Sequence, residues 1–362
     1  MPNNDEFKIA VLPGDGIGIE VMDACLDVLR HIQTKLGGFS LVTETLPCGA
    51  GHYLEAGTDL PDETFRKAQD ADAVLLGAMG LPNIRRADGT EINPQLDFRI
   101  EFELFAGVRP VKVLPGIPAA LTDPRAADID LIVIREQTEG LFIDIREEKA
   151  ENDDEVADRC LITRPGTERV VDFAFDLARR RKGEGRKGKV TCVDKANVLS
   201  SMAFFRKVFD ERAALNADIE PDHAYIDITA HNLVRRPWDY DVMVMENLFG
   251  DIVSDLTAAL IGGMGVAPSA DLGAKHGVFQ PCHGTAPDIA GQGIANPTAM
   301  LLSAALMLDW LGENQDHAMC KEAGRLLEGA VKQGYVLGRI KPAEFGGSDG
   351  TASIAATVKE LI

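Results

Sequence analysis

Short apolar runs alternate with longer amphipathic stretches along most of this chain. The runs of strand length are Ile9–Leu12, Ala73–Leu76, Leu131–Ile134, Lys189–Val193 and Tyr240–Met245. The amphipathic stretches of helix length include Ile19–Leu36, Val170–Arg180 and Met202–Arg212. Strands that are each followed by a helix typically form parallel sheets covered by helices. The pattern therefore predicts an α/β architecture with a largely parallel sheet.

Length and composition narrow the class of protein. With 362 residues and 45% hydrophobic content, the chain is long enough for two domains with separate cores. Its net charge of -20 argues against a nucleic-acid partner, because neutralising phosphates requires a basic face. The six cysteines include no CxxC pair, which favours reduced thiols over a zinc site or disulfides.

Two features of the sequence argue against a signal peptide and a membrane-spanning helix. The chain passes from polar residues directly into the strand expected at 7–12, leaving no room for a signal peptide. No apolar run reaches the ~18 residues that a membrane-spanning helix needs. We therefore expect a cytoplasmic protein without a membrane partner.

A glycine-rich segment, Pro13–Gly18, follows the first predicted strand and precedes a predicted helix. A dinucleotide-binding fingerprint occupies the same place in a Rossmann fold. Here the spacing is GxGxG rather than GxGxxG, and no acidic residue ends a second strand about 20 residues later. The segment therefore argues against a Rossmann GxGxxG fold.

Two aspartates, Asp251 and Asp255, follow the apolar run Tyr240–Met245. We expect Gly250 to break that run and Asp251 to open a helix that ends near Leu260. Side chains four residues apart project from one helix face, so the two carboxylates repel unless a cation or proton lies between them. Oxygen-only ligands favour Mg²⁺ or Mn²⁺. The alternative is an aspartate favoured by the helix dipole with a solvated partner one turn later.

Three arginines lie at the ends of predicted elements. Arg99 is near the end of a helical segment, and Arg109 is held in extended conformation by the proline that follows it. Arg135 follows a strand, at the carboxyl end where α/β sites form. Arginines so placed can clamp carboxylates in bidentate geometry, although an isolated arginine is usually a surface residue. Lys195 and Asp227 also follow strand-like runs, and each alone is typical of a surface residue.

Together these segments resemble the β-decarboxylating dehydrogenases, which comprise 3-isopropylmalate, isocitrate, tartrate and D-malate dehydrogenases. The matching segments, in order, are Leu12–Gly18, Arg99 with Arg109-Pro110, Arg135–Gly140, Asp194–Asn197, Asn247–Asp255, His283–Ala290, Gly293–Thr298 and Phe345–Gly347. The resemblance runs from about residue 7 to the C-terminus. It implies an isopropylmalate dehydrogenase-like fold of two open α/β domains with the active cleft between them, and it favours the metal interpretation of the aspartates.

The resemblance also implies an activity and a set of roles. Such enzymes oxidise the hydroxyl of a malate-type acid with NAD(P) and then release CO₂ from the β-keto acid. The substrate carboxylates would be held by Arg99, Arg109 and Arg135. Mg²⁺ or Mn²⁺ would be bound by Asp251 and Asp255 together with Asp227 of the partner subunit. Lys195, also from the partner, would be the general base, so the active unit would be a homodimer with shared sites.

The resemblance further predicts the cofactor. The adenosine half would be held by Ile17, His283, Gly284, Thr285, Ala286, Pro287, Asp288, Ile289 and Asn296. Asp288 can accept hydrogen bonds from the ribose hydroxyls and would repel a 2′-phosphate. NADP-using relatives carry Lys and then Tyr where this chain has Asp288 and Ile289. NAD is therefore the predicted cofactor.

Two positions depart from the family pattern. Phe142 stands where relatives have a tyrosine that is thought to protonate the enol after CO₂ leaves. Water or another acid would then protonate, or decarboxylation would be slow, or the reaction would stop after oxidation. Gln95-Leu96 stands where isopropylmalate enzymes have a pair of leucines, which ranks a malate- or tartrate-like diacid above 3-isopropylmalate, and isocitrate or homoisocitrate lower.

We expect residues 1–104 plus 262–362 to form the NAD-binding domain, which contains both termini. Residues 105–261 would form the metal-binding and dimerisation domain, with an arm near 142–165. An alternative function is a non-catalytic regulatory subunit of the same family. Such subunits typically lose a metal aspartate or the lysine, whereas this chain keeps Asp227, Asp251, Asp255 and Lys195.

Overall fold

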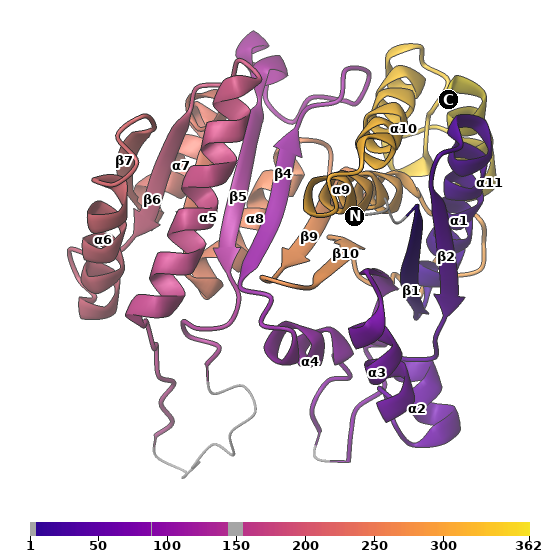
Figure 1. The fold of residues 1–362 in the computed structure, drawn as a ribbon, viewed down its shortest axis with the longest axis horizontal. Helices are drawn as coiled ribbons and strands as arrows, with labels where there is room; N and C mark the ends of the chain where they lie inside the picture. The colour runs from indigo at the N-terminus through magenta and orange to yellow at the C-terminus, as the bar shows by residue number, and fades with distance from the viewer. Residues whose placement is uncertain (1–4, 88, 144–154) are drawn as a thin grey trace. The chain divides into compact units, whose positions relative to one another are not determined.

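The computed structural model describes residues 5–87, 89–143 and 155–362. Within these ranges, ten β-strands and eleven α-helices follow one another in mixed α/β order (Figure 1). The chain divides into two compact units: unit 1 comprises Met1–Phe102, Leu114–Ala120 and Ile261–Ile362, and unit 2 comprises Glu103–Val113 and Leu121–Leu260. The predicted α/β class is confirmed.

Unit 1 contains five strands in the order β2 (Ser40–Thr45), β1 (Glu6–Gly14), β3 (Ala73–Ala78), β10 (Gly277–Pro281) and β9 (Pro268–Leu272). Only β9 runs antiparallel to its neighbour β10 within the unit. Its helices are α1 (Ile17–Leu36), α2 (Ala50–Ala56), α3 (Asp62–Asp70), α4 (Pro94–Glu101), α9 (Thr298–Asn314), α10 (Ala318–Val336) and α11 (Thr351–Leu361). All of β3 is buried, as expected for a parallel strand covered on both faces.

Unit 2 contains the strands β4 (Ala106–Lys112), β5 (Asp130–Glu136), β8 (Val242–Met245), β6 (Lys189–Asp194) and β7 (Glu220–Tyr225), in that order. Here β4 is antiparallel to β5, and the other pairs are parallel. The helices α5 (Arg164–Gly183) and α6 (Ser200–Ala213) lie in front of these strands in Figure 1, whereas α7 (Ile226–Arg235) and α8 (Asn247–Leu260) lie behind them.

The register of unit 2 brings several strand ends to one edge. Arg135 of β5 and Val193 of β6 both pair with Met245 of β8. Residues that follow these positions therefore emerge together from the carboxyl ends of the parallel strands, where sites form in α/β sheets.

Four of the five predicted strand-like runs lie within observed strands and the fifth does so in part, and two boundaries around Asp251 were wrong. The strand expected from Tyr240 begins at Val242, after a short 3₁₀ turn. Helix α8 begins at Asn247 rather than at Asp251, because the Glu246 carboxylate accepts the N–H groups of Leu248 and Phe249 at 3.1 and 2.7 Å.

Gly250 consequently lies inside α8 and does not end the apolar run as expected. A Cβ at this position would lie 2.6 Å from Cβ of Arg135. The glycine therefore lets the first turn of α8 approach β5 closely, which is a packing role rather than a break.

The observed units can be set beside the expected domains. The segment Leu114–Ala120, expected in the second domain, groups with unit 1. Gly116 explains this placement, since a Cβ there would meet the Tyr335 carbonyl oxygen at 2.3 Å. The NAD-binding, metal-binding and dimerisation roles, and the cleft, stay predictions. Most of the expected arm, residues 144–154, lies outside the described residues.

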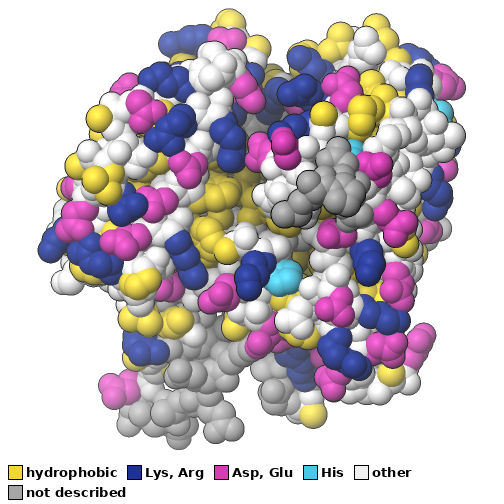
Figure 2. All heavy atoms as spheres, viewed as in Figure 1, with side chains coloured by type: hydrophobic (Ala, Val, Ile, Leu, Met, Phe, Trp, Pro, Cys, Tyr) yellow, Lys and Arg dark blue, Asp and Glu magenta, His cyan; other side chains and the backbone are white. Residues whose placement is uncertain are grey.

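The surface carries charges of both signs. On the face that Figure 2 shows, lysine and arginine side chains are interspersed with aspartate and glutamate. Among the described helices, none is long and apolar enough to cross a membrane.

Candidate active site

Four predicted site residues gather in unit 2. Asp251 and Asp255 lie one turn apart on α8, and Arg135 comes from the end of β5. Nη1 of Arg135 forms a close ion pair with Oδ1 of Asp251, and its Nε donates to Asn247 Oδ1 at 2.8 Å. The charge of Arg109, which is buried on β4, also acts on Asp255. The structure therefore groups two acidic and two basic side chains around the start of α8.

Asp255 shows the electrostatic consequence of this grouping. Its pKa is raised above the usual value by partial desolvation and then by the negative charge of Asp251, whereas Arg135 and Arg109 act in the opposite direction. The side chain keeps access to solvent, so the repulsion from Asp251 is the contribution that a bound cation would relieve. The role of the two aspartates as metal ligands stays a prediction.

The donor set fits a hard divalent cation in type but is incomplete in number. Two aspartate carboxylates suit Mg²⁺ or Mn²⁺, which prefer oxygen ligands. In the described part of the chain, no group of three or more His, Cys, Asp or Glu side chains could hold a metal ion. Asp227 is accordingly not grouped with the pair on α8. Its expected arrival from the partner subunit stays a prediction.

Lys195 and Asp227 form a second charged pair within unit 2. Nζ of Lys195 lies 2.6 Å from Oδ1 of Asp227. The hydrogen bond from Lys195 holds the pKa of the Asp227 carboxyl below its usual value. Lys195 directly follows β6, and Asp227 lies in the first turn of α7 after β7. The fold thus brings together the predicted base and the predicted third ligand.

Phe142 lies beside the charged cluster rather than away from it. Its ring is 5.7 Å from the guanidinium carbon of Arg135, a cation–π arrangement. The position that carries a hydroxyl in the relatives is therefore occupied by an apolar ring against a predicted substrate-binding arginine.

Arg99 lies on α4 of unit 1 and has a partner that the sequence did not indicate. Its Nε donates to Oδ2 of the buried Asp271 at 2.9 Å, and Gln280 donates to the same oxygen at 3.1 Å. This buried ion pair orients the guanidinium. A substrate carboxylate would then bind through the Nη groups.

Gln95 and Leu96 are partly buried in the first turn of α4. The Gln95 Nε2 donates to Asn93 Oδ1 at 3.3 Å. Its Oε1 is buried and has no hydrogen-bond donor among the described residues. A buried acceptor without a donor is unfavourable by ~1–3 kcal/mol, so this oxygen is a place where a ligand donor would be stabilised.

In unit 1, the predicted cofactor loop packs on the glycine-rich segment. The N–H of Ile17 donates to the Thr285 carbonyl at 2.8 Å. A Cβ on Gly16 would meet that same oxygen at 2.0 Å, and the φ of Gly16 is +57°. Only glycine allows this approach without strain. The segment that resembled a dinucleotide fingerprint therefore supports the loop that follows residue 283.

One atom of the predicted cofactor loop, Nε2 of His283, is a candidate contact for the expected cofactor. Nε2 of His283 is buried without a hydrogen-bond partner among the described residues, while Nδ1 contacts the Gly284 carbonyl at 2.9 Å. Burial lowers the pKa of this histidine, which favours the neutral ring. Asp288 is exposed nearby in the sequence. The loop therefore offers an orphaned ring nitrogen and a carboxylate, which fits a nucleoside ligand.

Asn296 differs from this expectation because its amide is already engaged. Its Nδ2 donates to Tyr335 Oη at 3.2 Å and to Glu344 Oε1 at 2.5 Å, and its Oδ1 accepts from the N–H of Thr298 at 3.1 Å. The side chain is buried. Its role beside an adenine stays a prediction, and the contacts show a structural role.

Three further residues support the site without having been predicted. Asp15 accepts the N–H groups of Ala50, Gly51 and Gly80 at 2.7–2.8 Å. Glu20 accepts the N–H groups of Gly293 and Ala295, each at 3.2 Å, and so joins α1 to the cofactor region. Asp271 orients Arg99. No local signal identifies them, because their partners are distant in the sequence.

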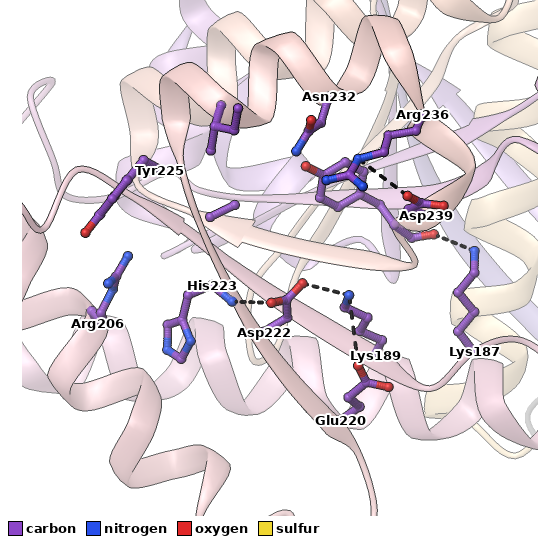
Figure 3. Close-up of a pocket in the computed structure, with 13 residues that line it drawn as sticks. Lys187, Lys189, Arg206, Glu220, Asp222, His223, Tyr225, Asn232, Arg236 and Asp239 are labelled. Atoms are coloured by element: carbon purple, nitrogen blue, oxygen red, sulfur yellow. Dashed lines mark hydrogen bonds and ion pairs between the residues drawn. The ribbon is translucent and has the colours of Figure 1, made fainter.

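A cavity of about 710 Å³ opens in unit 2 beside β7 and α7 (Figure 3). Some of its charged residues pair with one another, as Lys189 does with Asp222 at 2.7 Å. The lining includes Arg206 and Tyr225 but none of the predicted arginines or aspartates. We therefore do not assign this cavity as the substrate site.

Comparison with known proteins identifies the family of this chain. A family model described as isocitrate/isopropylmalate dehydrogenase matches residues 8–360. A 3-isopropylmalate/3-methylmalate dehydrogenase of Methanocaldococcus jannaschii is 40% identical over 356 residues, which cover 98% of both chains. A probable tartrate dehydrogenase/decarboxylase of Bacillus subtilis is 38% identical over 354 residues, 96% of both chains.

The solved structures give the same answer. An isocitrate dehydrogenase from Methylococcus capsulatus matches with a TM-score of 0.86 and 35% identity, covering 98% of this chain and 99% of that one. The predicted resemblance and fold class are therefore confirmed. This chain belongs to the isocitrate/isopropylmalate dehydrogenase family, whose members are dehydrogenases acting on hydroxy acids.

Proposed function

We propose that this protein oxidises a malate-type 2-hydroxy diacid with NAD and a divalent cation, Mg²⁺ or Mn²⁺, and then decarboxylates the product. The observation that carries the proposal is the cluster of Asp251, Asp255, Arg135 and Arg109. The charge of Asp251 raises the pKa of Asp255 after desolvation, and the two arginines lie close enough to act on Asp255 in the opposite direction. Such a cluster can hold a cation and an anionic substrate side by side.

The arginines would bind and orient the substrate. Arg109 and Arg135 are buried, so their hydrogen bonds to a carboxylate would be little weakened by water. Arg99, oriented by Asp271, would hold a further carboxylate oxygen. A diacid offers two carboxylates to these arginines, whereas a monoacid offers one.

Lys195 would take the hydroxyl proton during oxidation, a step typically worth ~10²–10⁴-fold. The 2.6 Å contact with Asp227 holds Nζ of Lys195 in one place. When bound, the divalent cation would stabilise negative charge on substrate oxygens, and NAD would accept the hydride. Phe142 has no proton to give, so the enol must be protonated from elsewhere.

The choice of diacid rests on Gln95. Its buried Oε1 has no donor among the described residues. A hydroxyl on the third carbon, as in tartrate, would supply that donor, whereas the isopropyl group of 3-isopropylmalate would leave it unpaired. The relatives named for isopropylmalate and for tartrate are similar to this chain at 40% and 38% identity, so overall similarity does not separate them. This contact ranks tartrate above 3-isopropylmalate, whereas D-malate carries neither a hydroxyl nor an isopropyl group on its third carbon and is ranked with tartrate by the sequence resemblance alone.

We also propose that the protein acts as a homodimer with shared sites. Exposed apolar side chains lie on the two helices that carry the predicted metal ligands: Ile228 and Val234 on α7, and Ile252 on α8. These helices pack on each other within unit 2. A second copy would cover this face. Full activity at a monomeric mass in analytical ultracentrifugation would contradict this proposal.

A panel of 2-hydroxy diacids tests the function. NADH and CO₂ are measured separately for tartrate, D-malate, 3-isopropylmalate and isocitrate, with Mn²⁺ and after chelation. We expect NADH with at least one diacid, abolished by chelation. Tight Mn²⁺ binding without NADH from any diacid would instead favour a regulatory subunit.

Gln95→Leu tests the substrate ranking. The variant removes the buried acceptor and should change the ratio of kcat/KM for tartrate over 3-isopropylmalate by about 10-fold towards 3-isopropylmalate, equivalent to ~1.4 kcal/mol. Gln292→Leu, in an exposed turn, serves as the control. An unchanged ratio would show that Gln95 does not contact the variable group.

A further inference from the structure

We propose that Arg206 is a positioning residue that holds Lys195 and Asp227 in their mutual geometry. The inference rests on the proposed function for its kinetic meaning, but its structural content stands on contacts within unit 2. Arg206 lies on α6 and forms no hydrogen bond with Lys195 or Asp227 within the described part of the chain. It contacts instead the last residue of each of the two strands that lead to them.

The first strand end is that of β6. Asp194, the last residue of β6, is fully buried. The Arg206 guanidinium forms a bidentate ion pair with its carboxylate: Nε donates to Oδ2 at 2.7 Å and Nη2 donates to Oδ1 at 2.8 Å. Asp194 Oδ1 also accepts the N–H of Ala196 at 2.8 Å. This bond spans Lys195, so the turn that aims the lysine is closed by a carboxylate that Arg206 orients.

The second strand end is that of β7. The guanidinium carbon of Arg206 lies 4.9 Å from the ring centre of Tyr225. Nζ of Lys195 lies 5.8 Å from the same ring. Tyr225 is the last residue of β7 and directly precedes α7, whose first turn carries Asp227. One arginine therefore ties the end of each strand from which the pair Lys195–Asp227 arises.

This arrangement explains why arginine rather than lysine occupies position 206. A planar fork can bind Asp194 with two nitrogens while its face stacks on Tyr225. A lysine would keep the charge beside the buried carboxylate but would lose the second hydrogen bond and the stacking. Figure 3 shows Arg206 and Tyr225 together at one side of the cavity.

The helix offers a matched control. Arg212, also on α6, binds Asp172 with the same two nitrogens, Nε and Nη2, each at 2.7 Å. It touches neither strand end that carries the pair. Comparing Arg206→Lys with Arg212→Lys therefore separates the general effect of losing a bidentate ion pair on α6 from the specific effect of losing the Arg206 contacts with the ends of β6 and β7.

The experiment measures kcat and both KM values for wild type, Arg206→Lys and Arg212→Lys, with crystal structures of all three. We expect Arg206→Lys to lower kcat by about 10²-fold, because displacement of a catalytic group by ~1 Å has an effect of that order. The KM for NAD and for the diacid should change less than about threefold, since the binding groups are elsewhere. Arg212→Lys should keep kcat, and the Lys195–Asp227 distance of 2.6 Å should lengthen only in Arg206→Lys.

The outcomes are distinct. Unchanged kcat and an unchanged Lys195–Asp227 contact in Arg206→Lys would overturn the inference. Equal losses of kcat in both variants would also overturn it, because they would show a general effect on α6. A wild-type protein that forms no NADH from any diacid would end the proposed function instead. The crystallographic distance would then decide the positioning role alone.

Discussion

The charged cluster of unit 2 and the cofactor loop of unit 1 are built in different ways. In unit 2, Arg135 holds Asp251 through their opposite charges, and the charge of Asp251 in turn acts on Asp255. In unit 1, the chain after residue 283 is held by hydrogen bonds to its backbone: the Thr285 carbonyl accepts from the N–H of Ile17, and the Glu20 carboxylate accepts from the N–H groups of Gly293 and Ala295.

The difference teaches which properties each region controls. A cluster held by charge responds to anything that changes charge, including protons, cations and an anionic substrate. A loop held by backbone hydrogen bonds responds mainly to packing and to the loss of acceptors. We therefore expect changes in unit 2 to alter catalysis and pH dependence, and changes in unit 1 to alter cofactor affinity.

The largest effect is expected for Asp251→Asn. The change removes one carboxylate of the proposed metal pair and the partner of Arg135, so several kcal/mol of charge stabilisation would be lost. We expect kcat/KM to fall by about 10³-fold and Mn²⁺ affinity, measured by calorimetry, to fall with it. Asp176→Asn is the control, because Asp176 pairs with Arg179 at 2.6 Å on the surface of α5. Undiminished Mn²⁺ affinity would refute the assignment of Asp251.

The second prediction concerns pH and Glu136, which directly follows Arg135. Burial raises the pKa of its carboxyl to about 7, from an ordinary value of 4.5. Between these pH values the folded state binds more protons than the unfolded state, so stability falls as pH rises towards 7. The loss approaches roughly 3 kcal/mol for a shift of this size.

Urea unfolding of wild type and Glu136→Gln between pH 4 and 8 tests this dependence. The free energy of unfolding of wild type relative to the variant should decrease through this window and level off above it. The glutamine can still accept from the Thr138 or Glu139 N–H, which bond to Glu136 at 2.9 and 2.7 Å. A difference that stays constant with pH would contradict the raised pKa.

The third prediction sharpens the contrast in unit 1. Glu20→Ala removes the acceptor of two amides in the segment 293–295. We expect KM for NAD to rise about 10-fold, which corresponds to the loss of one or two hydrogen bonds of ~1 kcal/mol each. The kcat and the affinity for Mn²⁺ should remain. Asp23→Ala, exposed on the same helix, should change neither KM nor kcat. A fall in kcat at constant KM would contradict the expectation that changes in unit 1 alter cofactor affinity rather than catalysis.

The smallest effect is expected for Phe142→Tyr. The new hydroxyl would lie near Arg135, where Phe142 now stacks, and could give the enol a proton. We expect the ratio of CO₂ to NADH to rise a few-fold, within the range of general acid catalysis at an imperfectly placed group (at or below ~10²-fold). Phe204→Tyr is the control, because Phe204 also stacks on an arginine, Arg164. An unchanged ratio would show that position 142 does not control the second half-reaction.

Local patterns in the sequence located five of the ten described strands, while the roles of the site residues stay predictions. Apolar runs located β3, β5 and β6, because a parallel strand covered on both faces must be apolar throughout. The segments around Arg135, Lys195 and Asp251 were recognisable because their residues are neighbours in the chain. The start of α8 was misplaced, since its cap is Glu246 and its Gly250 serves contact with Arg135, which is 115 positions earlier in the printed numbering.

What the sequence determined by itself is the family, the α/β class and the chemical types present: acidic pairs, arginines and a lysine at strand ends. Which of these groups meet was decided by the tertiary structure. The forked contact of Arg206 with Asp194, the hold of Asp271 on Arg99 and the reach of Glu20 to residues 293 and 295 join elements far apart in the chain. Such contacts depend on how strands and helices pack, and a hydrogen bond leaves no periodic trace in the sequence.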